Sequence, residues 1–157
     1  MIPDPAVERT IRRTSIATAA IAIVLSPIPL ADELVLLPIY AVLTTSIAKS
    51  RGLDRKQVPW RPILGTATAG LGARAAVNVT VSYIPGVAAL ANAASAVALT
   101  ELFGRYVDGA CADPSQARVL SVKELLVGLR ERVKAMKWAV PWRRGPATRT
   151  NGAAAAV

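Results

Sequence analysis

The chain has 157 residues, of which 53% are hydrophobic and 18% are charged, and its formal net charge is +9 at pH 7. One cysteine and no histidine exclude an intramolecular disulfide, a multi-cysteine metal site and catalysis through a serine–histidine or cysteine–histidine pair. Residues 115–157 hold nine of the lysines and arginines but only two acids. Such a basic segment suits anionic lipid, nucleic acid or an acidic partner.

The first apolar arm of the chain turns at Pro27 and Pro29. Each proline lacks an amide donor and disfavours helix in the residue before it, so a helix over 5–25 is expected to end before this turn. A second helix is expected after it. Asp32 can cap that helix, and Gly52 can end it.

The second apolar arm turns at Pro85 and Gly86. Two helices are expected here, over 63–83 and 87–107. Both carry small residues at spacings of three and four, a pattern that lets two backbones approach closely. Gly72 is expected at the contact between these two helices. The two arms together predict an all-α fold of two antiparallel helical hairpins with proline-containing tips, followed by a basic amphipathic helix.

Few polar side chains interrupt the apolar arms. In an antiparallel second hairpin Asn78 lies opposite Asn92, and a hydrogen bond between them is expected unless each amide is solvated independently. Arg74 lies at the centre of the third helix, and an ionisable group inside a membrane segment is a functional hypothesis by default. Glu101 is its expected partner. The competing interpretation of Arg74 is purely structural, as a buried ion pair or an arginine that snorkels to the surface.

The remaining polar residues do not indicate catalysis. Asp32 and Glu33 form an acidic pair, but acid–base catalysis needs two different environments and a further group. A helix cap and a solvated tip explain this pair better. Cys111, in a polar connector, is expected to be inert. Nucleic-acid binding is not expected, because the basic tail has no reading motif and few aromatic side chains for stacking. We expect no enzyme, cofactor or metal site.

The C-terminal part begins with a polar connector over 108–120, after which Ser121 and Glu124 match a capping box. The helix that follows is expected to run to about residue 140, with one apolar stripe and a basic opposite face. It is expected to lie on anionic headgroups or to pack on the bundle as an ordinary amphipathic helix, and both can hold together. Its candidate membrane-surface residues are Lys123, Arg130, Lys134, Lys137, Trp138 and Trp142. A disordered tail is expected over 143–157.

The basic residues gather on the side of the hairpins away from the tips. They flank the first helix, fill the loop over 49–61 and dominate the C-terminal segment, whereas the tips carry none. By the positive-inside rule, the termini and central loop are expected to be cytoplasmic and the hairpins to lie in the cytoplasmic (inner) membrane. A spanning helix needs about 20 apolar residues, and these stretches are short. Spanning hairpins, inserted hairpins and a soluble cytoplasmic bundle therefore all stay open.

Four short motifs resemble those of a known family. They are Pro-Ile-Pro-Leu-Ala-Asp at 27–32, Gly-Leu-Gly-Ala-Arg at 70–74, Ile-Pro-Gly at 84–86, and a small-residue helix that ends in Thr100, Gly104, Arg105 and Tyr106. Over residues 10–107 the chain resembles the YcjF-type bacterial domain of unknown function, which occurs alone or fused behind small GTPase domains and is described as membrane-associated. The resemblance implies recurring positions, with no catalytic role, at Pro27, Pro29, Asp32, Arg74, Pro85 and Gly86. It also implies that a GTPase would be a separate partner.

The residues and the resemblance together predict a non-catalytic, membrane-associated helical protein. Residues 1–110 would form the hairpin domain, 111–142 the connector and basic helix, and 143–157 the tail. The protein would act as a scaffold or adaptor, for a GTPase or for a self-assembled homo-oligomeric complex. Two alternatives are an oligomeric membrane-perturbing or pore-forming protein and a soluble helical module that binds a protein partner.

Overall fold

The computed structural model describes residues 4–25, 31–81 and 88–135, and within them every regular element is helical. The elements are α1 (Pro5–Leu25), α2 (Ala31–Ser50), α3 (Trp60–Val81), α4 (Ala88–Ala112), the short 3-10 helix η1 (Pro114–Gln116) and α5 (Val122–Ala135). The predicted all-α class is therefore confirmed. The predicted tip residues Pro27, Pro29, Pro85 and Gly86 lie outside the described residues, as do Lys137, Trp138, Trp142 and the tail.

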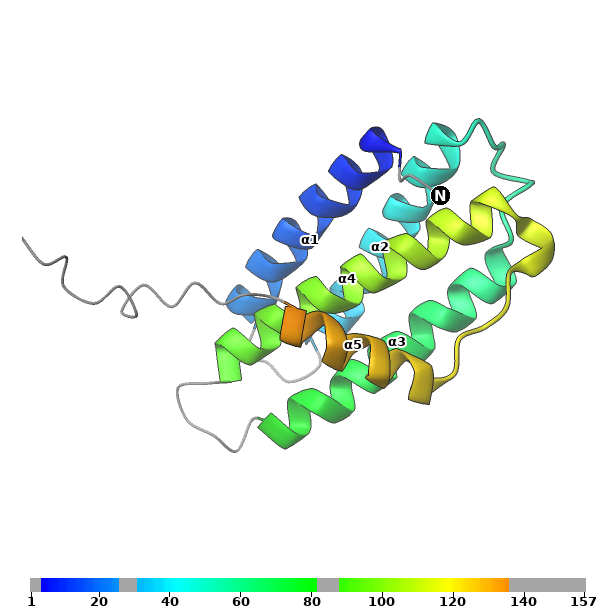
Figure 1. Cartoon of the computed structure of the whole chain (residues 1–157). Helices are drawn as coiled ribbons and strands as arrows, with labels where there is room; N and C mark the ends of the chain where they lie inside the picture. The colour runs from blue at the N-terminus through cyan, green and yellow to red at the C-terminus, as the bar shows by residue number, and fades with distance from the viewer. Residues whose placement is uncertain (1–3, 26–30, 82–87, 136–157) are drawn as a thin grey trace, which may run out of the picture.

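The first four helices form a bundle whose members run in alternating directions (Figure 1). The end of α1, the start of α2, the end of α3 and the start of α4 lie at one end of the bundle, which we call the tip end; the opposite end is the base. α4 is the central element, because it contacts α1, α2, α3 and α5. α5 crosses the outer side of α3 and α4 (Figure 1).

Local hydrogen bonds explain where several of these helices begin and end. Asp4 Oδ1 accepts from the amide of Ala6 at 2.8 Å and caps α1. Gly52 has a left-handed backbone (φ +71°), which allows the amide of Leu53 to reach back to the last turn of α2. The predicted capping box is confirmed: the Glu124 amide donates to Ser121 Oγ at 3.3 Å, and the Ser121 amide donates to Glu124 Oε2 at 2.9 Å.

α4 is longer than the sequence predicted. The segment assigned to the start of the polar connector continues this helix to Ala112. Its apolar face explains the difference, because Val107, Ala110 and Cys111 are all buried in the core. Asp108, which made the segment look like a loop, forms an ion pair with Arg51 at 2.6 Å and so stays at the surface of the folded helix.

The hydrophobic core follows α4 from the middle of the bundle to the base. Phe103 of α4 stacks on Tyr40 of α2, with ring centroids 4.7 Å apart. Small residues of α4 allow α1 to approach closely: a Cβ added at Gly104 would lie 2.7 Å from Ile11. The predicted contact at Gly72 is wrong, because that residue is exposed and a Cβ there would meet nothing within 4 Å.

Candidate functional site

A completely buried arginine lies inside the bundle near the tip end. Arg74 of α3 has 0% of its side chain exposed, and its Nη1 is 2.7 Å from Glu33 Oε2 of α2. Its Nη2 donates to Asn92 Oδ1 at 2.6 Å, and its Nε donates to Ser95 Oγ at 3.2 Å. A buried guanidinium is tolerated only when it is paired and hydrogen-bonded, and these contacts meet that condition.

The same network reaches the first helix. Asn92 uses its amide nitrogen to donate to the carbonyl of Ala22 at 2.9 Å. One set of side chains therefore ties α1, α2, α3 and α4 together at the tip end. We call Arg74, Glu33, Asn92 and Ser95 the arginine network. In this network the Glu33 carboxylate neutralises the guanidinium, and Asn92 and Ser95 accept from its remaining N–H groups. The network therefore stabilises a charged group inside an apolar bundle.

Two sequence-based assignments of these residues are wrong. Glu101 is not the partner of Arg74: it accepts from Arg132 of α5 at 3.2 Å instead. Glu33 is not a solvated tip residue, since 12% of its side chain is exposed and it pairs with Arg74. Both errors have one cause: Arg74 was expected to pair within its own apolar arm of the chain, whereas its partner Glu33 belongs to the other arm. The side chains of Asp32 and Asn78 lie outside the described part of the chain, as does the predicted Asn78–Asn92 bond.

A second polar layer lies next to the arginine network, on the side towards the base. Thr18 of α1 and Thr100 of α4 share a hydrogen bond of 3.0 Å, and the Tyr40 hydroxyl lies 3.5 Å from Thr100. All three side chains are buried. Sequence reasoning missed this layer because isolated threonines in an apolar helix carry no signal of what they face.

The outer surface of the bundle divides into two zones. We use the name tip half for the side chains of residues 14–25, 33–48, 62–76 and 89–100, a set that on α2 and α3 extends almost to the base. Among these side chains no exposed one is charged. Large apolar side chains are exposed instead, namely Ile16, Ile23, Val24, Leu34, Val35, Val42, Leu64 and Leu90. Exposed basic residues lie towards the base, namely Arg9, Arg12, Arg13, Lys49, Arg55, Lys56 and Arg61.

The outer face of α5 is also basic. Leu125 and Leu129 are buried against the bundle, whereas Lys123, Arg130 and Lys134 are exposed. The contact with Glu101 fixes Arg132 on the flank of α4. The helix therefore packs on the bundle, as one of the two sequence-based interpretations expected, and its basic side faces outward.

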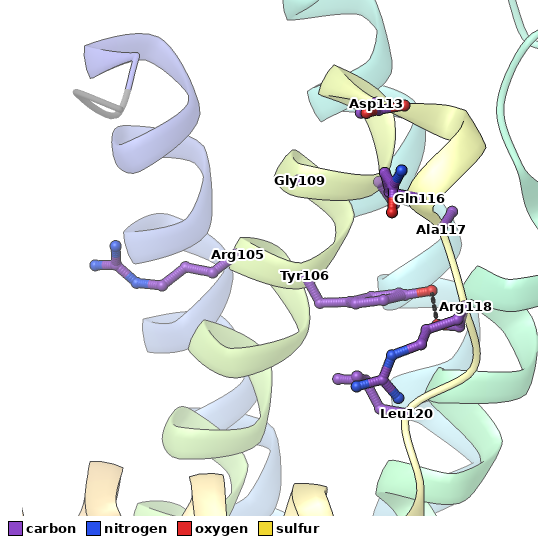
Figure 2. Close-up of a pocket in the computed structure, with 9 residues that line it drawn as sticks. Arg105, Tyr106, Gly109, Asp113, Gln116, Ala117, Arg118 and Leu120 are labelled. Carbon is purple, nitrogen blue, oxygen red and sulfur yellow. Dashed lines mark hydrogen bonds between the residues drawn. The ribbon is translucent and has the colours of Figure 1, made fainter.

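A cleft of about 350 Å³ lies near the base between α4 and the segment that leads into α5 (Figure 2). Tyr106 extends across it and donates to the carbonyl of Arg118 at 2.8 Å. The two arginines that line the cleft pair with carboxylates of the chain itself, Arg105 with Glu8 and Arg118 with Glu124. In Figure 2 the Arg105 side chain points away from the cleft.

Cys111, which lies in α4 rather than in a connector, is buried, and this burial raises the pKa of its thiol. Within the described residues there is no group of three histidine, cysteine, aspartate or glutamate side chains placed to hold a metal ion.

These features define an all-α helical-bundle protein with a buried arginine network and, among the described side chains of the tip half, no exposed charge. No family model, curated protein or solved structure matches the chain. Within the described residues one stretch, Glu33–Ser50 of α2, is long and apolar enough to cross a membrane by length and composition, and 33% of it is buried inside the bundle.

Proposed function

We propose that the chain is a non-catalytic membrane-associated protein that inserts the tip half of its bundle into a bilayer and serves there as a scaffold or adaptor. The observation that carries this proposal is the uncharged, apolar exposed surface of the tip half. Val24 and Leu34, at the ends of neighbouring helices, each have 74% of their surface exposed. Large apolar side chains exposed in number over one part of a protein mark an interaction site with protein or membrane.

The exposed hydroxyl groups of the tip half support a lipid partner. Ser46 Oγ donates to the carbonyl of Val42 at 2.9 Å, and Thr68 Oγ1 donates to the carbonyl of Leu64 at 3.1 Å. Each hydroxyl proton is therefore satisfied within its own helix. In hydrocarbon every polar group must find such a partner in the protein, because no water is present.

The distribution of charge supports the same partner. Along α1, α2 and α3 the exposed cations begin where the apolar surface ends, and anionic headgroups attract basic side chains placed beside an inserted segment. The only described charges within the tip half, Glu33 and Arg74, are paired with each other away from the surface. The resemblance to a domain found behind small GTPases makes a GTPase the protein partner that we propose for the cytoplasmic base.

A soluble helical module that binds a protein partner is the second candidate. One observation favours this candidate: only one described helix has the length and composition of a membrane span, whereas two spanning hairpins would need four. In this case a protein surface would cover the same apolar side chains. The two candidates differ in where the expressed chain is found.

Membrane fractionation of the expressed chain tests the proposal. We expect retention through high-salt and alkaline carbonate washes. The double variant Val24→Lys/Leu34→Lys should shift to the soluble fraction, because lysine near the bilayer centre costs about 2.5–3.5 kcal/mol, while exposed substitutions change folding stability by only about 0.5 kcal/mol. Ala112→Lys, which adds charge at an exposed base position, is the control. A soluble parent chain, or a double variant that fractionates like Ala112→Lys, would contradict insertion.

A further inference from the structure

The loop that joins α2 to α3 at the base, residues 51–59, contains a closed turn (Figure 1). We call this segment the base loop. The Gln57 amide donates to the Asp54 carbonyl, and the Asp54 amide donates to Gln57 Oε1, each at 2.9 Å. The first of these bonds closes a four-residue turn. Arg55 and Lys56 are its two central residues, so the turn places two cations side by side in the chain at its corner.

The inner side of the base loop is anchored to the bundle. Val58 is buried, and Leu53 packs against the core. The Trp60 indole, which also packs against the core, donates through Nε1 to the carbonyl of Arg55 at 2.9 Å. Because the apolar side chains of the loop face the bundle, the cations of the turn stay exposed, and Arg61 in the first turn of α3 is exposed as well.

The cations of this region have no acidic partner in the described part of the chain. We call Arg55, Lys56 and Arg61 the loop cations. None of them forms an ion pair with a described carboxylate. Two other acids near the base are already paired, Glu8 with Arg105 and Asp108 with Arg51. Against the three loop cations the base loop itself holds one acid, Asp54, and its surface therefore stays positive and suits an anionic ligand.

The base loop lies where the exposed apolar surface of two helices ends. On α2 that surface includes Leu34 and Val42, and Lys49 is the first exposed cation after it. On α3 the exposed Leu64 follows directly after Arg61, within one turn. Trp60 lies at the same boundary, and tryptophan is enriched where hydrocarbon meets headgroups. Phosphate and hydrocarbon are neighbours in a lipid, as cations and apolar side chains are here.

We propose that the base loop binds the phosphate groups of anionic phospholipids through Arg55, Lys56 and Arg61, on the side of the bilayer from which the tip half inserts. This inference rests on the proposed insertion of the tip half, and it adds the lipid class and the residues that bind it. An arginine can bind one phosphate with two parallel N–H bonds. An acidic protein surface offers the same charge, but the apolar side chains that border the loop on both helices favour a lipid.

Vesicle flotation of the full chain tests this contact. We expect the parent chain to bind phosphatidylcholine vesicles that contain phosphatidylglycerol more tightly than pure phosphatidylcholine vesicles. The triple variant Arg55→Gln/Lys56→Gln/Arg61→Gln should bind the phosphatidylglycerol-containing vesicles roughly 100-fold more weakly, because each cation near anionic headgroups contributes about 1 kcal/mol, or about fivefold in affinity. Its binding to pure phosphatidylcholine should equal that of the parent, because insertion of the tip half does not use these side chains.

A matched control removes the same charge from the outer face of α5. In Lys123→Gln/Arg130→Gln/Lys134→Gln one of the three cations is already paired, Lys134 with Glu131, and we expect binding to weaken less than about tenfold. All six side chains are exposed, so both triple variants should fold like the parent. Equal weakening by the two would show that net charge, and not the base loop, makes the contact.

The other outcomes separate this contact from insertion. A loop variant that binds both kinds of vesicle like the parent would overturn the lipid contact, keep insertion, and leave the loop cations to an acidic protein surface. A parent chain that binds neither kind of vesicle would overturn the proposed function itself.

Tryptophan emission tests the position of the loop independently. The chain has three tryptophans, so Trp138→Phe/Trp142→Phe leaves Trp60 as the reporter. We expect a phospholipid with a nitroxide on its headgroup to quench Trp60 when the chain is bound to phosphatidylglycerol-containing vesicles, and the quenching to fall when the loop cations are replaced by glutamine. Unquenched emission from the bound parent would place the loop away from the headgroups and overturn the proposal.

Discussion

Replacing Arg74 tests whether the arginine network holds the four helices together. Arg74→Met keeps a long unbranched side chain but removes the charge, which leaves Glu33 and Asn92 without a donor that they use in the folded chain. Breaking a buried ion pair by removing one partner costs about 3–5 kcal/mol, because the other charge stays buried. Glu33 keeps 12% exposure, so we expect a value near 3 kcal/mol, or a melting temperature lower by roughly 6–12 °C.

A matched control exists on the flank of the bundle. Arg132 of α5 and Glu101 of α4 also form an arginine–glutamate pair between two helices, at 3.2 Å, but both side chains are 31% exposed. Such partly solvated pairs contribute about 0–1 kcal/mol. Arg132→Met should therefore lower the free energy of unfolding by less than about 1 kcal/mol, although it removes the same kind of contact.

Urea unfolding followed by far-ultraviolet circular dichroism measures both variants in the medium in which the parent chain is monodisperse. The double variant Arg74→Met/Glu33→Met completes a cycle, and it should be less destabilised than the sum of its two single variants, because no charge is then left without a partner. If Arg74→Met costs no more than Arg132→Met, burial of the arginine does not determine its energetic weight and the reasoning fails.

Two further predictions concern packing and pH. Gly104→Ala should destabilise the fold by about 1–3 kcal/mol, because the added methyl group would meet Ile11. Gly72→Ala should instead stabilise the fold by about 0.5–1 kcal/mol, because its site is open and alanine favours helix. If the urea midpoints of both variants shift in the same direction, Gly104 is not in a close helix contact or Gly72 is not at an open surface. Hydrogen bonds from Arg118 and from the Ser121 amide hold the pKa of Glu124 at about 2, so its capping contribution should be complete above pH 4.5 and be lost as the pH falls towards 2. An acid titration of stability should therefore flatten in this range for Glu124→Gln, and an unchanged profile would contradict this role.

Local chemistry explains which helix boundaries the sequence could predict. Gly52 and the box at Ser121 act through their nearest neighbours in the chain, and the structure places both as expected. The end of α4 was missed because Asp108 and Gly109 resemble a loop, while burial of Val107 and Cys111 on the other side of the helix outweighs that tendency.

Partners across the bundle were less predictable. The pairing of Arg74 with Glu33 depends on how the two arms of the chain pack together, which no spacing within either arm encodes. One signal was present: apart from Asp32, these are the only charged residues in the apolar arms between residues 14 and 48 and between 63 and 100. Opposite charges isolated in apolar surroundings favour each other strongly, and this argument would have outweighed the assignment of Glu33 to a solvated tip.

The ion pair between Glu33 and Arg74 also sets an order of assembly during synthesis. The two residues lie 41 positions apart in the chain, so the ribosome releases the carboxylate well before the guanidinium. Until α3 emerges, Glu33 has neither this partner nor the enclosure that α4 completes, and water or a bound proton must stabilise it. The first two helices are thus an incomplete folding unit. Under the proposed insertion, the first two helices would enter the bilayer only together with the second pair.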